Sequence, residues 1–479
     1  MTVLAVLALA TGWYVTRSFD TKVLVLVAVL PFLGWLQAHA AGVPWSLAVT
    51  GLIALLLLHA VRERPASTGR GAHGLTALVL GYGAVVAAQA FSTDLPSVLT
   101  GLRGARLVVE ALALYFIGAE VARRPVLVRR LVQVVLAGGA LVGAYAIKQW
   151  LAGFDAAEIA HYRRTFPIAI RERRIFSTLP GASALGHHLG LVALMSGAAL
   201  LVRPRRWVVP SALLATSLLG VLLTGQRGVQ LSVFAAGLAV VAVALCRPAF
   251  RREGARAGQV VTVLATAVIA LVLLTPVQDR RAASEPDRSA FDSARIKLAL
   301  LRDGADESSA RLRTERLGQT VDALLERPFG AGTGLNLLVD PERSARSTFL
   351  GQAGFGDETY RLPLDPLPGE SYYYTLASET GLPGLAGWLA ISWFGIASAA
   401  GIALRHPDRT KAAVALAACG YLVIVVVDSF TVDAMSSITV SGWFWLLVGM
   451  VGRWAHEDRL PRGGEVTAAS RPDGLQVTR

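Results

Sequence analysis

The residues of this chain that could do chemistry are a few charged side chains set among long apolar runs. Arg227, in the string LLTGQRGVQLSVFAAG, stands at the junction of two such runs, where the headgroup boundary or a protein cavity must solvate its guanidinium group. A functional arginine and an interfacial anchor both fit this position. Arg313 precedes Leu317 by four residues in an amphipathic stretch, where a solvated helix arginine is the plainer interpretation.

Glu370 opens the string ESYYYTLASETGLPG and directly follows Pro368 and Gly369. This position predicts a helix N-terminus. A capping or dipole role worth up to about 1 kcal/mol would explain the carboxylate as well as a chemical role does.

A further group of basic residues follows Lys148 within the stretch 151–181. Either a solvated loop or a site for an anionic ligand explains so many guanidinium groups in one connection. The group consists of Arg163, Arg164, Arg171, Arg173 and Arg174.

Familiar cofactor and protease motifs are missing from the sequence, which has no P-loop, HExxH, CxxC or GxSxG string. Cys246 and Cys419 both lie in apolar runs and are expected to pack there rather than form a disulfide or a thiolate metal site. The sequence therefore predicts neither a cofactor nor a metal site.

The elements that must position these charges are apolar. Of 479 residues, 54% are hydrophobic and 16% charged, too apolar an inventory for disorder or an ordinary soluble enzyme. Apolar runs of about 17 to 25 residues match the length with which a helix crosses about 30 Å of hydrocarbon. The sequence therefore predicts an all-α, polytopic bundle of about 12 or 13 transmembrane helices, and disfavours an outer-membrane barrel.

Apolar runs bounded by charge give the individual spans. They are 2–16, 22–39, 43–61, 74–92, 104–122, 127–150, 182–202, 207–224, 228–246, 258–276, 381–404, 411–428 and 437–453. Arginine and lysine gather in alternate connections, which the positive-inside rule assigns to the cytoplasm, with the N-terminus outside. Because the net charge of +13 lies mostly in these short loops, it does not indicate a nucleic-acid partner.

Four parts follow from this pattern. Residues 1–276 hold the first ten spans, including the outer loop 151–181; residues 277–380 form a helical loop domain outside; residues 381–455 hold the last three spans; and residues 456–479 form a tail expected to be disordered in the cytoplasm. The first run lacks the basic n-region and cleavage site of a signal peptide and is expected to stay in the mature protein. Within the outer domain, SARLRTERLGQTVDALLERPFG predicts an amphipathic helix.

Four strings, in this order, resemble elements of the O-antigen ligase and O-antigen polymerase superfamily, which are membrane glycosyltransferases that use undecaprenyl-diphosphate-linked glycans. RRIFSTLPGASALGHHLGL resembles its Arg, Thr-Phe, Asn-Pro-Asn stretch, and LLTGQRG is similar to its Thr-Gly-Ser-Arg-Gly signature. RTERLGQTVDALLERPFGAGTGL is similar to its Arg, Trp, Pro, Gly-x-Gly element. ESYYYTLASETGLPGLAGWL resembles the element that opens with His-Asn and continues to Glu-x-Gly-x-x-Gly.

This resemblance implies roles for particular residues. Arg227 and Arg313 would bind the donor diphosphate, and position 370 would hold the group that assists attack by the acceptor hydroxyl. Arg174 is a candidate third contact to phosphate or sugar, with a solvated loop as the alternative. Guanidinium donors in a partly dry cleft stabilise a departing lipid diphosphate without a metal, which agrees with these roles.

At position 370 the chain departs from the ligase pattern, because it carries Glu where the ligases carry His, and Ser371 follows where they carry Asn. A carboxylate also serves as a base toward a sugar hydroxyl. The exchange favours a polymerase of O-antigen, capsule or exopolysaccharide over a ligase that transfers the glycan to lipid A core. Gln226, Leu317 and the string around Pro180 are milder departures.

Tyr372 and Tyr373 follow Glu370 and are candidate sugar contacts, although a membrane-interface aromatic belt is the interpretation we favour. Arg106 and Glu110, spaced i, i+4, predict a structural ion pair.

The expected protein is thus a multi-pass enzyme of the bacterial inner membrane with its site on the periplasmic face. Its expected partners are a lipid-linked oligosaccharide donor, a glycan acceptor and membrane lipids. A membrane transporter, a peptidoglycan-type glycosyltransferase and an oligosaccharide transferase to protein remain as rivals. The transporter is disfavoured, because the spans carry almost no buried charge and no two halves match.

Overall fold

The computed structural model describes residues 16–40, 43, 45–62, 74–95, 97–165, 174–202, 208–247, 318, 320–322, 324–335 and 371–458. Several predictions lie outside these residues: the span 258–276, all but the end of the span 2–16, most of the outer domain and of the tail, and the two site residues Arg313 and Glu370.

Every regular element of the described residues is a helix, as predicted. The elements are α2 (Phe19–Val29), η1 (Leu30–Phe32), α3 (Leu33–His39), α4 (Trp45–Arg62), α5 (Gly74–Gln89), α6 (Val98–Ala122), α7 (Pro125–Ala152), α8 (Ala156–Thr165), α10 (Ala182–Val202), α11 (Val208–Leu223), α12 (Arg227–Cys246), α19 (Tyr372–Arg405), α20 (Arg409–Asp428), η4 (Ala434–Ser436) and α21 (Ile438–Glu457). Seven candidate spans among the described residues are long and apolar enough to cross a membrane, and α5 and α11 are shorter apolar helices. The chain is therefore a polytopic helical membrane protein.

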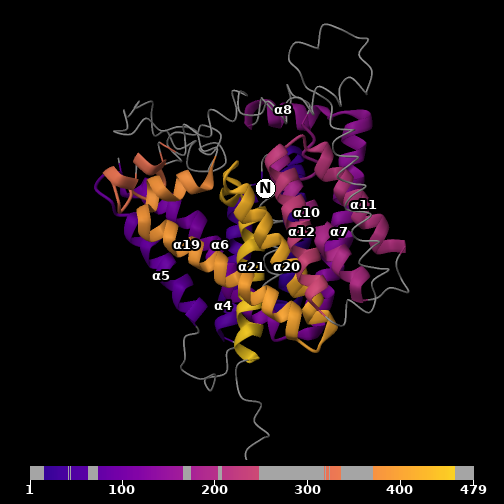
Figure 1. Cartoon of the computed structure of the whole chain (residues 1–479). Coiled ribbons are helices and arrows are strands. Elements are labelled where there is room, and N and C mark those ends of the chain that lie inside the picture. Colours follow the sequence, from indigo (N-terminus) through magenta and orange to yellow (C-terminus); the bar gives the residue numbers. More distant parts are fainter. Residues whose placement is uncertain are drawn as a thin grey trace, which may run out of the picture.

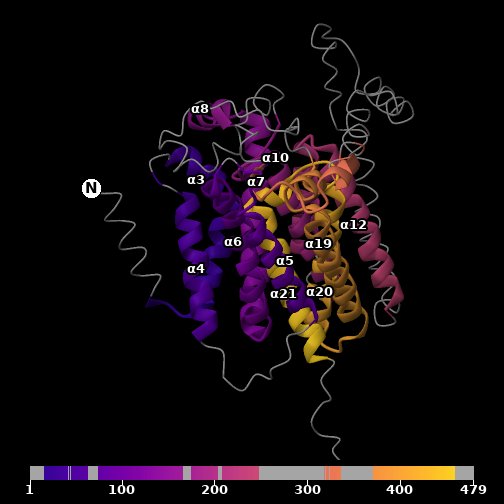
Figure 2. The ribbon, with the colours of Figure 1, turned by 90° about the vertical axis from the view of Figure 1, so that its left-hand side faces the viewer.

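The helices pack side by side in a bundle, several of them inclined in Figure 1 and most close to vertical in Figure 2, and α8 lies across the upper end of the bundle. Helices α6 and α21 pack closely at the centre: a Cβ at Gly118 of α6 would collide with the backbone oxygen of Leu446. The indole N–H of Trp454 donates a hydrogen bond to the backbone oxygen of Ala122 over 3.0 Å. Small residues at a helix crossing permit this close approach within a membrane.

The contacts between helix ends lie at two opposite ends of the bundle, and the basic residues that begin or end helices at Arg124 and Arg247 lie at the same end. At the lower end, Arg124 pairs with Asp20 over 2.7 Å, and the guanidinium group of Arg247 donates to the backbone oxygen of Ala403 over 2.7 Å. At the upper end, the backbone N–H of Trp35 donates to the oxygen of Thr178 over 2.9 Å. Successive helices therefore cross the bundle in opposite directions, as the predicted spans require.

The basic outer connection 151–181 differs from the solvated loop considered above, because it contains helix α8 packed on the bundle. Asp155 and Glu158 cap this helix reciprocally: each carboxylate accepts the backbone N–H of the other, over 2.9 and 2.8 Å. Glu158 is buried and also accepts hydrogen bonds from the hydroxyl of Tyr145 and the amide of Gln149, over 3.0 and 2.7 Å. These contacts fasten α8 to the top of α7.

Helix α19 also differs from its predicted span, since it begins at Tyr372 rather than at residue 381. Gly381 lies inside it with φ 63° and ψ −159°, a conformation that is essentially confined to glycine. The chain therefore forms a short helical segment, 372–380, at the upper end of the bundle before the long membrane helix starts.

Candidate functional site

Arg227 is the first residue of α12, and the string LLTGQRG forms the turn that places it there. Gly225 adopts φ 65°, and the Thr224 hydroxyl accepts the backbone N–H of Gln226 over 3.2 Å. The side-chain amide of Gln230 donates to the backbone oxygen of Leu222 over 3.1 Å, which ties α12 to the end of α11. The turn thus presents an exposed Arg227 at the upper end of the bundle.

Arg174 lies against the same turn. A Cβ placed on Gly225 would be 4.0 Å from Cγ of Arg174. Two of the predicted phosphate contacts, Arg174 and Arg227, thus come from segments far apart in the sequence to one place, which we term the basic corner.

A buried carboxylate supports the basic corner from below. A Cβ at Gly228 would lie 2.6 Å from Oδ1 of Asp428, and this oxygen accepts the Thr431 hydroxyl over 2.6 Å. The other oxygen, Oδ2, is 3.4 Å from Nε2 of His187, and both side chains are fully buried. A carboxylate against the first turn of a helix is favoured by the helix dipole, so Asp428 fixes the start of α12.

The start of α19 reaches the segment that follows Asp428. The backbone N–H of Tyr372 and the hydroxyl of Ser371 both donate to the backbone oxygen of Ser429, each over 3.0 Å. Ser371 is the described chain neighbour of Glu370, which itself lies outside the described residues. The structure therefore brings the first turn of α12 and Ser371 to residues 428–431, with Arg174 against the neighbouring turn at Gly225, while the placement of Arg313 and Glu370 stays a prediction.

Two of the strings that carry the family resemblance interlock through their backbones. The loop in RPFGAGTGL packs on the break of α19 in SETGLPG, where a Cβ at Gly381 would lie 2.5 Å from the backbone nitrogen of Gly330. Three hydrogen bonds join the strings: Ala331 N–H to Ser378 oxygen at 2.8 Å, Gly332 N–H to Glu379 oxygen at 3.0 Å, and Leu382 N–H to Pro328 oxygen at 2.8 Å. The loop that follows the predicted Arg313 helix is thereby fastened to the helix that follows Glu370.

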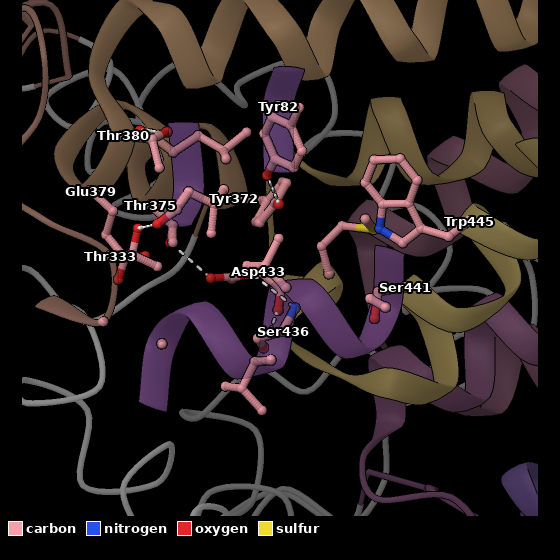
Figure 3. Close-up of a pocket in the computed structure, with 18 residues that line it drawn as sticks. Tyr82, Thr333, Tyr372, Thr375, Glu379, Thr380, Asp433, Ser436, Ser441 and Trp445 are labelled. Atoms are coloured by element: carbon pink, nitrogen blue, oxygen red, sulfur yellow. Dashed lines mark hydrogen bonds between the residues drawn. The ribbon is translucent and has the colours of Figure 1, made fainter. Parts of the chain in front are cut away.

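Beside this interlock lies a cavity of about 110 Å³ between α5, α6, α19, η4 and α21, which we term the upper cavity. Figure 3 shows Tyr82 and Tyr372 facing one another on its wall, with their hydroxyl groups 3.2 Å apart. Trp445 of α21 lines it as well, 5.9 Å from the ring of Tyr82. Three rings from three helices thus form much of its surface.

Two carboxylates, Glu379 and Asp433, also line the upper cavity, and they are only 9% and 7% exposed. Asp433 accepts hydrogen bonds from the Thr375 hydroxyl over 2.8 Å and from the backbone N–H of Ser436 over 3.2 Å. Among the residues described, no group of three or more histidine, cysteine or acidic side chains could hold a metal ion. The polar groups that line this cavity are mainly carboxylates and hydroxyls, which can form hydrogen bonds with a ligand.

The two predicted sugar contacts lie differently. Tyr372 lines the upper cavity. Tyr373 instead donates its hydroxyl to the backbone oxygen of Val426 over 3.0 Å and packs on Phe430, with ring centroids 4.2 Å apart. Their contact with a sugar stays a prediction.

The ion pair of Arg106 and Glu110 is confirmed at 2.8 Å, and the Thr50 hydroxyl also donates to Glu110 over 2.8 Å.

Sequence analysis missed the carboxylates Glu379, Asp428 and Asp433, together with His187. Signals were present: Glu379 belongs to the Glu-x-Gly-x-x-Gly string, and the acids of VVVDSFTVDAMSS separate two predicted spans. What the sequence does not reveal is the partner of each group, because these contacts join distant helices.

Residues 212–389 match the family model described as O-antigen ligase. The matched segment contains Arg227, Arg313 and Glu370, the loop 328–335 and the break at Gly381. None of the curated proteins matches the sequence.

Proposed function

We propose, from the match of residues 212–389 to the family model described as O-antigen ligase, that the chain moves a glycan from undecaprenyl diphosphate to a sugar hydroxyl. The observation that carries the proposal is that the first turn of α12, which carries Arg227, and the start of α19 both contact residues 428–431, while Arg174 lies against the turn at Gly225. These segments are far apart in the sequence, yet they meet at one end of the bundle. A site for a membrane-bound substrate requires such a meeting of distant segments near the membrane surface.

The basic corner suits the leaving group. When the glycosidic bond to the lipid diphosphate breaks, the bonding electron pair stays with the diphosphate and negative charge accumulates there. Arg227 and Arg174, with Arg313 as a third donor, would neutralise this charge through paired N–H groups and without a metal. Asp428 serves them indirectly, because it holds the first turn of α12 in place.

Glu370 would act as the general base. The acceptor oxygen forms a bond to the anomeric carbon, the carbon–oxygen bond to the diphosphate breaks, and the hydroxyl proton passes to the carboxylate. Ser371 and Tyr372, fixed to Ser429 by two hydrogen bonds, support this role because they restrain the chain next to Glu370.

The upper end of the bundle would face the outside of the inner membrane. Basic connections such as those near Arg124 and Arg247 lie at the opposite end, and the positive-inside rule assigns them to the cytoplasm. A lipid-linked donor on the outer leaflet would then meet the basic corner directly.

Two reactions fit the site. Glu370 in place of histidine supports a polymerase of O-antigen, capsule or exopolysaccharide, which joins one lipid-linked chain to another. The description of the matching family supports a ligase, which moves the chain to lipid A core or another acceptor. We propose the polymerase and keep the ligase as the second candidate.

The test is an incubation of the purified protein with an undecaprenyl-diphosphate oligosaccharide, without metal and without another acceptor. A ladder of longer chains on the lipid carrier is the expected product. Transfer only after lipid A core is supplied would establish the ligase. Movement of the intact lipid-linked substrate between leaflets, with no release of diphosphate, would reject the enzyme in favour of a transporter.

A further inference from the structure

The upper cavity and the basic corner are two distinct sites, and Tyr372 lies between them. The backbone of this residue bonds to Ser429 at the corner, whereas its ring lines the cavity. The two places differ in charge: Arg174 and Arg227 mark the corner, while Glu379 and Asp433 mark the cavity. A substrate that spans both would therefore place its anionic part at the corner and carry no anionic group into the cavity.

The charge of the upper cavity excludes a diphosphate, since like charges repel strongly where water is scarce. A group rich in hydroxyls suits it, because a carboxylate accepts strong hydrogen bonds from hydroxyl donors. The hydroxyl of Thr375 and the backbone N–H of Ser436 each donate a hydrogen bond to the carboxylate of Asp433, so its oxygens keep fixed positions. Glu379 lies on the same wall, in the segment fastened by the loop 328–335.

The remaining surface suits the faces of a sugar ring. Tyr82, Tyr372 and Trp445 supply aromatic rings, and aliphatic side chains of α6 such as Leu107 and Val108 complete the wall. Carbon–hydrogen faces of a pyranose pack on such surfaces while its hydroxyls turn to the carboxylates. The volume of about 110 Å³ is of the same order as the cavity of about 150 Å³ that holds benzene, so it admits no more than part or all of a single ring-sized group.

We propose that the upper cavity binds the acceptor sugar that carries the attacking hydroxyl, with Glu379 and Asp433 accepting hydrogen bonds from its other hydroxyls. The inference rests on the proposed function and assigns to it an acceptor subsite. The ring would enter beside Tyr372, two residues after the proposed base. Its attacking oxygen would then face the anomeric carbon of a donor whose diphosphate occupies the basic corner.

The first test uses the full-length protein with a lipid-free oligosaccharide as a separate acceptor, so that the KM for the acceptor and the KM for the lipid-linked donor can be measured apart. Glu379→Gln and Asp433→Asn keep the shape of each side chain but remove the charge, and losing one charge-assisted hydrogen bond should raise the acceptor KM about tenfold or more. The donor KM should stay within about twofold of wild type. Glu457→Gln, which removes a carboxylate at the opposite end of the bundle, is the control and should leave both constants unchanged. An unchanged acceptor KM in both cavity variants would overturn the proposal.

A second test uses the wild-type protein alone, so it does not depend on the folding of a variant. The probe is an oligosaccharide released from the surface polysaccharide of the source bacterium and labelled at its acceptor end with a photoreactive diazirine. Adducts are expected in the peptides that contain residues 372–380 and 433–445. Adducts confined to other peptides would overturn the proposal, even in an active enzyme. Adducts in these peptides without any diphosphate release would keep the sugar site and reject the proposed function.

Discussion

Gly381→Ala tests the interlock between the loop 328–335 and the break of α19. The new Cβ would lie 2.5 Å from the backbone nitrogen of Gly330, and alanine strongly disfavours φ 63° with ψ −159°. The backbone strain costs about 1 to 3 kcal/mol. Separating the strings also removes three backbone hydrogen bonds, worth about 0.5 to 1.5 kcal/mol each. We expect a total loss of about 2.5 to 7.5 kcal/mol, most of it local to the interlock.

Gly401→Ala provides a matched control on the same helix. No atom lies within 4 Å of its added Cβ, and alanine in a helix interior is favoured over glycine by about 0.5 to 1 kcal/mol. Reversible unfolding of the detergent-solubilised protein, with limited proteolysis of residues 328–335, measures both effects. Equal stability and equal protease resistance in the two variants would refute the interlock as a structural element.

Three further predictions concern the outer helix and the base. Glu158→Ala should destabilise the protein by about 3 kcal/mol in thermal unfolding, because it leaves the buried Gln149 amide and the Tyr145 hydroxyl without their carboxylate; a loss below about 0.5 kcal/mol, as expected for removing the exposed Asp94–Arg327 pair, would contradict this. Partial burial raises the pKa of Asp155, but the backbone N–H of Glu158 and the charges of His39 and Lys148 outweigh it and hold the pKa below its ordinary 3.8, so the stabilisation exists above that pH and fades as the pH falls below it. Asp155→Asn should therefore lower the melting temperature at pH 7 and lessen its fall between pH 5 and pH 3, and an unchanged acid profile would count against the cap. Glu370→Gln should abolish turnover while the fold persists, and undiminished turnover would remove its role as base.

The sequence predicted the fold well where the signal is local. Apolar runs and alternating basic loops require only the chemistry of single segments, and each predicted span that falls within the described residues coincides with a helix. The turn that presents Arg227 is also local, since Thr224, Gly225 and Gln226 build it. Helix α8 was missed although its capping pair, Asp155 and Glu158, stands in the sequence at the expected spacing.

The supports of the site could not be predicted, because they are contacts between distant segments. His187 against Asp428 joins α10 to α20, and Arg174 meets a turn between α11 and α12. The same holds for the upper cavity, where Tyr82 and Tyr372 come from helices separated by most of the chain. Family resemblance located the strings, but only the packing shows which strings touch.

The most direct test of the central claim is the rate of lipid diphosphate release in Arg227→Ala, measured in a single turnover with saturating donor. Arg453→Ala, which removes an arginine from the lower end of the bundle, is the matched control. Loss of a preorganised donor to a developing anion should slow release about a hundredfold or more in Arg227→Ala and leave Arg453→Ala near wild type. Release at the same rate in both correctly folded variants would contradict the assignment of the basic corner to the leaving group.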